Sequence, residues 1–479
     1  MKIMAKIKKA WFCTACGNES AKWMGKCPAC GEWNTMVEEI VGKGDDGNIT
    51  SRNRAFLESI AGTPQRLSEI NSTNESRITL GNSELDRVLG GGLVEGSLIL
   101  IGGEPGIGKS TLSLQIPLYC NHLKTLYISG EESVRQIKLR ADRLMRQPDF
   151  GDNTNMYPES DTGNMSDADN CLILSETLLE NILTQAKVVK PQLLIIDSIQ
   201  TIYSQNIESS AGSVSQVREC AASLLRFAKE SNTPVILIGH ITKDGSIAGP
   251  KILEHIVDVV LQFEGDTRHS YRILRSIKNR FGSTAELAVY EMTSQGLREV
   301  LNPSEMFIPM HDNNLSGTAV AATLDGTRPF LIEIQALVST AAYGTPQRSA
   351  TGFDVRRMNM LLAVLEKRVG FKLAQKDVFL NMAGGLRVSD PACDLAVVAS
   401  ILSSNFDVTL SNDTAFAGEI GLSGEIRPVS QVERRIIEAE KLGFKQILVS
   451  SFSKIPSGLE KGIQIMRVAN IQELVKAVF

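Results

Sequence analysis

Short apolar runs alternate with amphipathic stretches through the middle of the chain. The apolar runs are LILIGG (98–103), TLYIS (125–129), QLLIID (192–197) and TPVILIGHIT (233–242). Between the last two, the stretch VSQVRECAASLLRFAKE repeats its apolar positions with the spacing of a helix. Strands that alternate with helices form a parallel sheet with helices on both faces. The pattern predicts an α/β domain with a mainly parallel sheet over residues 77–300.

The pattern changes on both sides of this domain. Residues 39–76 include GKGDDGNITSRNR and show no sustained apolar period, which predicts a linker after a small module at 1–38. Residues 301–479 begin with a pair of strands around DGTRP and continue with longer mixed stretches, which predicts a separate α+β domain. Three domains suit a chain of 479 residues.

The composition of the chain limits which binding partners and which cellular compartment we expect. The formal net charge of −4 excludes a uniformly basic surface, so contacts with nucleic acid would have to be local. The chain has neither an apolar run of membrane-spanning length nor a signal-peptide core. We therefore expect a cytoplasmic protein without membrane contact, in which the eight cysteines are thiols or metal ligands rather than disulfides.

Four of these cysteines have the spacing of a metal site. Cys13, Cys16, Cys27 and Cys30 form C-x2-C-x10-C-x2-C, with a glycine after each pair. Each C-x-x-C presents two thiolates from one tight turn, and four thiolates complete the tetrahedral shell of a structural Zn²⁺. So short a segment cannot bury enough apolar area to fold alone, and binding of the metal would supply the missing free energy of folding. The alternatives are a redox pair or chance clustering, and the spacing does not name a partner for the module.

The sequence GGEPGIGKST (102–111) follows a predicted strand and opens a predicted helix. This context supports a phosphate-binding loop of the form G-x-x-x-x-G-K-[ST]. Its glycines let backbone amides surround the phosphates of ATP, the lysine reaches the terminal phosphates, and the serine hydroxyl binds Mg²⁺. The candidate nucleotide-binding residues are Gly103, Glu104, Pro105, Gly106, Ile107, Gly108, Lys109, Ser110 and Thr111.

Polar residues at the ends of other strands complete the candidate site. Asp197 ends an apolar run and is expected to act on the Mg²⁺ shell. Glu131 and Glu132 follow another strand, and we prefer Glu131 for orienting the attacking water, a solvated carboxylate being the alternative. His240 and Thr242 end a third strand, where a polar group can sense the terminal phosphate, although a purely structural histidine fits equally.

The sequence KNRFG places Lys278 and Arg280 on a tight turn near the end of the α/β domain. This basic turn has no acidic partner nearby in the sequence. An arginine there can complete the active site of a neighbouring subunit, as arginine fingers do. The alternative is an exposed, solvated turn.

Taken together, these motifs resemble the RadA (Sms) family of bacterial DNA repair proteins, which carry a RecA-like ATPase domain. The resemblance covers nearly the whole chain, and its most distinctive elements are YISGEES, GHITKDGSIAGPKILEHIVD and KNRFG. It implies a hexameric ring that uses ATP to move along single-stranded and branched DNA, promoting branch migration and strand exchange with the RecA recombinase.

The resemblance also implies roles for particular residues. Lys109, Ser110 and Asp197 would serve the nucleotide and Mg²⁺. Lys278 and Arg280 would couple ATP to DNA and to the adjoining subunit. TKDGSIAGPK would face the pore of the ring, with the lysines meeting phosphates at Lys243 and Lys251.

One segment departs from the family. Residues 148–170 are acidic, contain neither Lys nor Arg, and are longer than the family leads us to expect. This composition predicts a disordered surface loop.

The last third of the chain resembles the Lon protease domain, whose active site needs a serine in DGPSAG and a lysine downstream. Aligned with that pattern, SDPACD has Ala392 at the serine position, and the lysine position falls on Glu433. Cys393 is displaced by one residue, which turns it about 100° around a helix. Because a nucleophile needs a nearby base, we expect a domain without peptidase activity.

Three functions therefore remain to be compared. We favour a DNA-dependent ATPase motor acting in recombinational repair. An ATP-dependent protease would require the missing dyad. An ATP-switched scaffold would bind nucleotide without stimulation by DNA.

Overall fold

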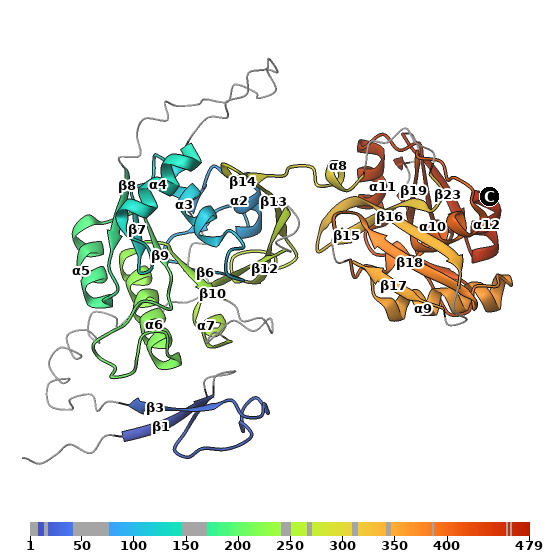
Figure 1. Ribbon diagram of the computed structural model, residues 1–479. Coiled ribbons are helices and arrows are strands. Elements are labelled where there is room, and N and C mark those ends of the chain that lie inside the picture. The colour runs from blue at the N-terminus through green and yellow to red at the C-terminus, as the bar shows by residue number, and fades with distance from the viewer. Residues whose placement is uncertain are drawn as a thin grey trace, which may run out of the picture. The chain divides into compact units, whose positions relative to one another are not determined.

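The amino-terminal module consists of three antiparallel strands, β1 (Lys8–Cys13), β2 (Glu19–Ser20) and β3 (Met36–Val41), in the order β2-β1-β3 (Figure 1). The computed structural model describes residues 8–13, 18–41, 76–145, 170–240, 251–265, 271–308, 315–341, 346–385, 388–456, 458–459 and 462–479. Cys16, Thr242 and Lys243 and almost all of the acidic segment 148–170 lie outside the described residues. Strand β3 continues beyond residue 38, where we expected the module to end.

A nine-stranded sheet forms the centre of the α/β region. Its strand order is β14-β13-β12-β11-β6-β10-β9-β7-β8. The six strands from β11 to β8 are mutually parallel, whereas β12, β13 and β14 are added antiparallel at one side. The prediction of a mainly parallel sheet is therefore confirmed. The strands are β6 (Leu98–Gly103), β7 (Thr125–Ser129), β8 (Cys171–Ser175), β9 (Leu193–Asp197), β10 (Val235–His240), β11 (Val259–Glu264), β12 (Tyr271–Asn279), β13 (Leu287–Thr293) and β14 (Gly296–Glu299).

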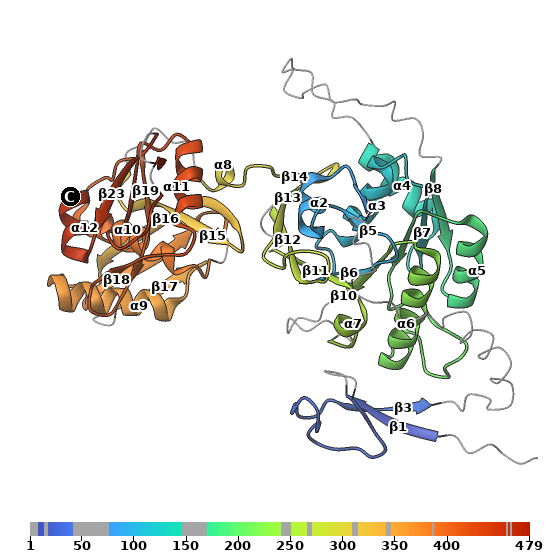
Figure 2. The ribbon, with the colours of Figure 1, turned by 180° about the vertical axis from the view of Figure 1, so that it is seen from behind.

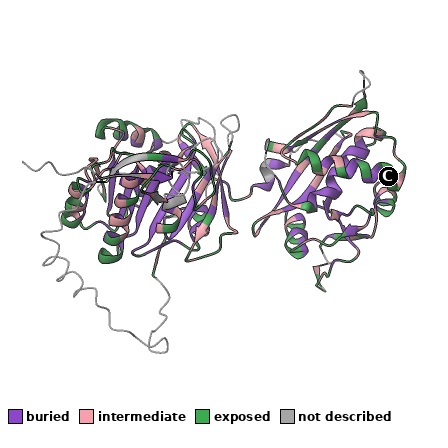
Figure 3. Ribbon diagram, turned by 90° about the horizontal axis from the view of Figure 1, so that it is seen from below, coloured by how far each residue is buried: buried purple, intermediate pink, exposed green. Residues whose placement is uncertain are grey.

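Helices cover both faces of this sheet. Ile99 and Ile101 of β6 pack in one apolar cluster with α2, α3 and α4, and the alternate residues Leu98 and Leu100 pack in a second with α5, α6 and α7. Burial on both faces explains why these strands are continuously apolar. In Figure 3 the central strands are buried while the outer faces of the helices are exposed. The helices are α2 (Ser83–Leu89), α3 (Lys109–Tyr119), α4 (Val134–Met145), α5 (Leu179–Val189), α6 (Val214–Ser231) and α7 (Lys251–Ile256).

The first helix of this region shows how local sequence sets the element bounds. The side chain of Asn82 accepts a hydrogen bond from the Leu85 amide (2.8 Å), and Gly90 ends the helix with φ at 87°. Asn and Gly favour these two positions because of the amide cap and the left-handed backbone. Strands β4 (Arg77–Ile78) and β5 (Leu93–Val94) pair on either side of α2 in the sequence.

Residues Val300–Phe479 form a second compact unit, separate from Met1–Glu299. Its mixed sheet has the order β17-β18-β16-β15-β19-β22-β23, and the buried helix α10 packs on β15 and β16 (Figure 2). The unit contains α8 (Ser304–Phe307), β15 (Thr318–Asp325), β16 (Arg328–Thr340), β17 (Arg348–Thr351), α9 (Val355–Val364), η3 (Leu365–Val369), β18 (Lys376–Met382), η4 (Ala383–Gly385), η5 (Pro391–Cys393), α10 (Asp394–Phe406), β19 (Thr414–Ala417), β20 (Glu419–Ile420), β21 (Ile426–Arg427), α11 (Val432–Lys441), β22 (Gln446–Ser450), β23 (Gln464–Val468) and α12 (Ile471–Val478).

The pair of strands expected around DGTRP is the β15–β16 hairpin, in which Asp325 faces Arg328. Within the described part of the chain, no helix combines the length and the apolar character needed to cross a lipid bilayer.

Candidate nucleotide-hydrolysis site

The glycine-rich loop joins the carboxyl end of β6 to the first turn of α3. Gly106 and Gly108 have φ values of 77° and 118°, in the left-handed region that favours glycine. A Cβ on Gly103 would lie 2.9 Å from the Cβ of Phe263 on the neighbouring strand β11. Glycine is therefore needed at these positions for backbone shape and close packing. A loop of this shape at a helix amino terminus fits the phosphates of a nucleotide.

Lys109 lies at the centre of the loop and is only 4% exposed. Its Nζ donates hydrogen bonds of 2.8 Å to the backbone oxygens of Gly103 and Glu104. Burial lowers the pKa of this ammonium group to about 8, and the carboxylates of Asp197 and Glu131 oppose that shift. The loop therefore holds a buried amine whose charge is stabilised by nearby anions and by backbone oxygens.

Asp197 ends β9 and lies on the same sheet edge as the loop, because β10 pairs with both β9 and β6. The Tyr127 hydroxyl donates a 2.7 Å hydrogen bond to Asp197 Oδ2, and Ser113 Oγ of α3 lies 3.4 Å from the same hydroxyl. Burial, followed by the Asp197 charge, raises the pKa of Tyr127 well above its usual value. Tyr127 therefore stays a proton donor and fixes the orientation of the carboxylate.

Sequence reasoning did not include Tyr127 in the site. Its position in TLYIS resembles any aromatic residue in a buried strand. The available signal was the hydroxyl itself, because a buried tyrosine normally finds a hydrogen-bond partner.

Glu131 lies beside Asp197 and His240. Ser198 Oγ donates a 2.7 Å hydrogen bond to Glu131 Oε1, and His240 Nε2 lies 3.4 Å from the same oxygen. Burial acts to raise the pKa of this carboxyl, but the hydrogen bond from Ser198 and the contacts with His240 and Lys109 outweigh it and lower the pKa. Glu131 is thus held as a carboxylate at the strand edge.

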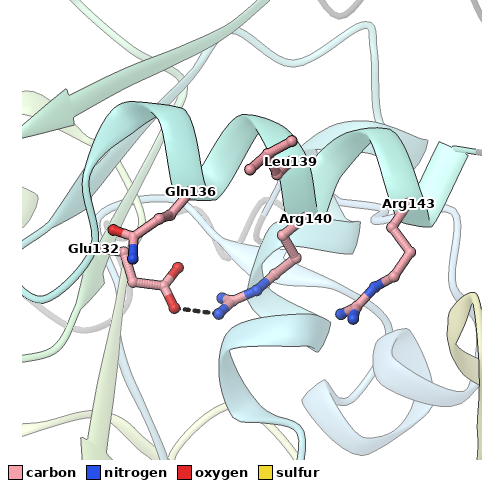
Figure 4. Close-up of a pocket in the computed structure, with 5 residues that line it drawn as sticks. All are labelled: Glu132, Gln136, Leu139, Arg140 and Arg143. Carbon is pink, nitrogen blue, oxygen red and sulfur yellow. Dashed lines mark hydrogen bonds and ion pairs between the residues drawn. The ribbon is translucent and has the colours of Figure 1, made fainter.

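Glu132 has a different environment. Its carboxylate forms an ion pair with Arg140 of α4, and its amide donates a hydrogen bond to Ser129 Oγ (3.0 Å). Figure 4 shows this pair together with Gln136, Leu139 and Arg143 of α4. These five residues line a pocket of about 300 Å³. The geometry therefore brings Glu131, and not Glu132, to Ser198 and His240.

The KNRFG turn is tied to its own subunit. Arg280 Nη1 lies 3.1 Å from Oδ1 of the buried Asp258, which also accepts hydrogen bonds from Lys229 (3.2 Å) and from the Leu98 amide at the start of β6 (3.1 Å). The acidic partner missing from the local sequence is therefore Asp258, which lies 22 residues upstream.

Lys278 of the same turn also contacts backbone. Its Nζ donates to the oxygens of Glu254 (2.5 Å) and Val257 (2.8 Å), at the carboxyl end of α7. Burial lowers the pKa of Lys278, and the adjacent positive charge of Arg280 adds to that effect. Helix α7 follows residues 241–250 in the sequence, and Lys278 contacts the carboxyl end of this helix. Lys251 is the first residue of α7.

Three of the four predicted zinc ligands come together in the amino-terminal module. The Sγ atoms of Cys13, Cys27 and Cys30 all lie within 4.8 Å of one another. Such a group of thiols fits three corners of a tetrahedral Zn²⁺ shell. The fourth predicted ligand, Cys16, is among the residues not described.

The turn before α10 carries the residue that aligns with the serine of the Lon-type dyad. Ala392 and Cys393 are fully buried, and burial raises the pKa of the Cys393 thiol to about 12. Glu433 is exposed on α11. The basic residue that reaches the turn before Ala392 is the buried Arg435, whose Nη1 lies 2.6 Å from Asp390 Oδ2. A guanidinium does not deprotonate in proteins, so it cannot act as the base.

Comparison with curated proteins decides the family. DNA repair protein RadA of Bacillus subtilis is 47% identical over 478 residues, and the match covers 99% of each chain. The chain belongs to the RadA family of DNA repair proteins. The RadA proteins of Listeria monocytogenes and of a Synechocystis strain are 47% and 45% identical, covering 99% and 98% of this chain and 99% and 94% of their own lengths.

Family models match the three regions of this RadA family member separately. A KaiC-type ATPase model matches residues 78–298, a rubredoxin metal binding domain matches residues 11–38, and subunit ChlI of Mg-chelatase matches residues 337–452. Among solved structures, a KaiC-like protein of Pyrococcus horikoshii and the RadB recombinase are 20% and 21% identical. They cover 47% and 46% of this chain and 99% of their own, with TM-scores of 0.37 and 0.35. The predictions of a RecA-like ATPase domain and a zinc ribbon are confirmed, while the resemblance to the Lon domain stays a prediction.

Proposed function

We propose that this RadA family protein is a DNA-dependent ATPase that moves on single-stranded and branched DNA in recombinational repair, promoting branch migration and strand exchange with RecA. The main support is the gathering of Lys109, Asp197 and Glu131 at one sheet edge. A phosphate loop, a strand-end aspartate and a glutamate held as a carboxylate are the parts that ATP hydrolysis requires.

Each residue then has a distinct task. The loop Gly103–Thr111 holds the phosphates, and Lys109 moves from its backbone partners to the terminal phosphates. Ser110 and Asp197 would hold Mg²⁺, and the bound ion would supply positive charge to the transferred phosphoryl group. Glu131 orients the attacking water and accepts its proton, while His240 contacts Glu131 and senses the terminal phosphate.

The coupling to DNA runs through the end of the ATPase domain. Lys278 binds the carboxyl end of α7, and α7 follows the segment that carries Lys243. A movement of KNRFG would therefore displace the segment 242–251, in which Lys243 and Lys251 meet DNA phosphates. Contacts with phosphates do not read sequence, which suits a protein that moves along DNA. Arg280 reaches the active site of the neighbour in a hexameric ring.

Zn²⁺ in the amino-terminal module is proposed to be structural. Four thiolates leave no open position for catalysis. The cluster of Cys13, Cys27 and Cys30 supplies three of them, and Cys16 supplies the fourth.

The test is ATP turnover with and without single-stranded DNA over a range of salt concentrations, with Lys109→Ala as the inactive control. The motor predicts turnover that rises with DNA. Turnover that ignores DNA at every salt concentration would reject the motor and favour an ATP-switched scaffold. Casein cleavage above the level of a blank would instead favour a protease.

A further inference from the structure

All three tryptophans of the chain lie in the zinc module, at positions 11, 23 and 33. Trp23 and Trp33 are 54% and 68% exposed, whereas Trp11 packs partly against the cysteine cluster. Large aromatic side chains are seldom left exposed without a use, because they contribute much of the binding energy of interfaces. The two exposed indoles therefore point to a contact surface.

The two indoles lie beside each other on a short hairpin. A Cβ placed on Gly25 would be 3.5 Å from Cη2 of Trp23 and 3.7 Å from Cζ3 of Trp33, so both rings border the same glycine. Asn34 donates a 2.8 Å backbone hydrogen bond to Gly25, and Lys26 pairs with Trp33 across an antiparallel bridge. A larger residue at position 25 would fill the space between the rings.

The metal knuckle holds this hairpin in shape. The Cys27 amide donates to the oxygen of Glu32 (2.8 Å), and the Gly31 amide donates to the oxygen of Cys27 (2.9 Å). Trp33 therefore follows directly from a turn that carries two of the thiols. Binding of Zn²⁺ to Cys27 and Cys30 would fix the position of the indoles.

A positive charge accompanies the aromatic rings. The ammonium of Lys26 lies 5.7 Å from the centre of the Trp33 ring, and Lys22 is exposed beside Trp23. Glu32 is the acidic side chain next to them on the same hairpin. Exposed aromatic faces bordered by lysines combine the two contacts that single-stranded nucleic acid offers, namely unstacked bases and phosphates.

We propose that Trp23 and Trp33 form a stacking platform for the bases of single-stranded DNA, with Lys22 and Lys26 contacting the adjoining phosphates. Duplex DNA does not present its base faces, so it would not fit the platform. The platform gives the zinc module a role in holding the strand that does not depend on the ATPase motor.

The location of the tryptophans makes the test direct in the full-length, zinc-loaded protein. Tryptophan emission reports on this module alone. We expect a thymidine oligonucleotide to quench the emission saturably, and an abasic oligomer of equal length or a duplex to leave it unchanged. Equal quenching by all three would overturn the proposal, because it would reflect charge alone.

Variants separate the platform from the rest of the chain. Trp11→Phe should keep the quenching, and Trp23→Ala with Trp33→Ala should abolish it. In Trp33→Ala, the oligonucleotide concentration for half-maximal quenching of the remaining signal should rise roughly 5- to 100-fold. Lys26→Gln should lower the slope of log affinity against log salt by about 0.7. Quenching that persists in the double variant would overturn the proposal.

Two further measurements complete the test. Zinc content shows whether the module is folded, and Trp33→Phe, which keeps an aromatic face, should retain quenching if an alanine variant loses zinc. Emission that responds to RecA but not to the oligonucleotide would make the surface a protein contact and overturn the proposal. Turnover stimulated by DNA without quenching rejects the platform alone, and quenching without stimulation rejects the motor alone.

Discussion

At the scale of single residues, Lys109 is buried and yet must carry a positive charge to bind the terminal phosphates of a nucleotide. Burial favours the neutral amine, while Asp197, Glu131 and Glu104 favour the ammonium group, and the balance leaves its pKa at about 8. A nucleotide triphosphate adds further negative charge and favours the ammonium group more strongly. Binding above pH 8 must therefore take up a proton.

The pH dependence of nucleotide affinity tests this point. Below pH 8 the ammonium group is already present, so affinity should be nearly constant with respect to Lys109. Above pH 8, affinity should fall by up to about tenfold per pH unit, because each binding event must protonate the amine. Calorimetric titration from neutral to alkaline pH measures the slope. Lys109→Arg keeps its charge and should remove that slope, and equal slopes in both proteins would contradict the assignment.

The neighbouring glutamates provide a matched pair of variants. Glu131→Gln removes the carboxylate beside Ser198 and His240, and it should retain nucleotide binding but slow hydrolysis about 10²- to 10⁴-fold. Glu132→Gln removes the partner of Arg140 instead, and it should stay within a few-fold of the wild type. Single-turnover hydrolysis measures both. A larger loss in Glu132→Gln would reverse the two roles.

The sequence contained the residues of this site but not all of their contacts. The loop, Asp197 and the two glutamates are visible because they follow apolar runs. The preference for Glu131 depends on Ser198 and His240, which are remote in the sequence, and on Arg140 pairing with the other glutamate. Tyr127 was missed because its hydroxyl has meaning only once Asp197 lies beside it.

At the scale of elements, the KNRFG turn shows how one buried carboxylate joins several parts of the domain. Asp258 connects Arg280, Lys229 of α6 and the amide that begins β6. The sequence predicted an arginine without a nearby acid, because Asp258 precedes β11 while Arg280 follows β12. Pairing of these antiparallel strands brings the two residues together.

Two variants distinguish a role of Arg280 at the active site of a neighbouring subunit from its ion pair with Asp258 in its own subunit. Arg280→Ala should retain nucleotide binding and lose DNA-stimulated hydrolysis and branch migration, by about 10³-fold or more if it acts as an arginine finger. Lys229→Ala removes another partner of the same aspartate and should leave branch migration nearly intact. A branch-migration assay compares them. Normal migration by Arg280→Ala would refute this role, and equal losses would assign the effect to Asp258.

The elements around Ala392 predict the absence of peptidase activity. Ala392 is buried at the turn before α10, and the basic group that pairs with Asp390 of this turn is the guanidinium of Arg435, which cannot act as a base. We expect no casein cleavage by the wild-type protein, and none by Ala392→Ser, because a serine hydroxyl without a base is a weak nucleophile. Release of labelled peptides measures this. Cleavage by either protein that increases with enzyme concentration would contradict the expectation.

At the scale of the whole molecule, the α/β region was predictable because each apolar run is a strand buried on both faces. The antiparallel strands β12 to β14 were less evident, since β12 alternates in burial and all three lie at one side of the sheet. Strand β3 extends to Val41, because Ile40 and Val41 pair with Lys9 and Lys8 of β1.

Assembly is the prediction that belongs to this scale. If Arg280 completes a neighbouring site, full activity requires several subunits. Particle-mass measurements should show a species of about six chains with ATP and single-stranded DNA, and dilution that dissociates it should lower turnover per chain. A single chain that hydrolyses ATP at the full rate under all conditions would exclude the ring.

The ion pair between Arg435 and Asp390 limits which substitutions the carboxy-terminal unit tolerates. Asp390 also accepts hydrogen bonds from Thr323, Leu324 and Ala392, so the arginine belongs to a network that supports the turn. Loss of one partner of such a buried pair costs about 3 to 5 kcal/mol. A proteolytic centre at this turn would require both a new hydroxyl and a new base, and replacing Arg435 to supply that base would weaken the unit. A single substitution at Ala392 or at Arg435 is therefore not expected to create such a centre.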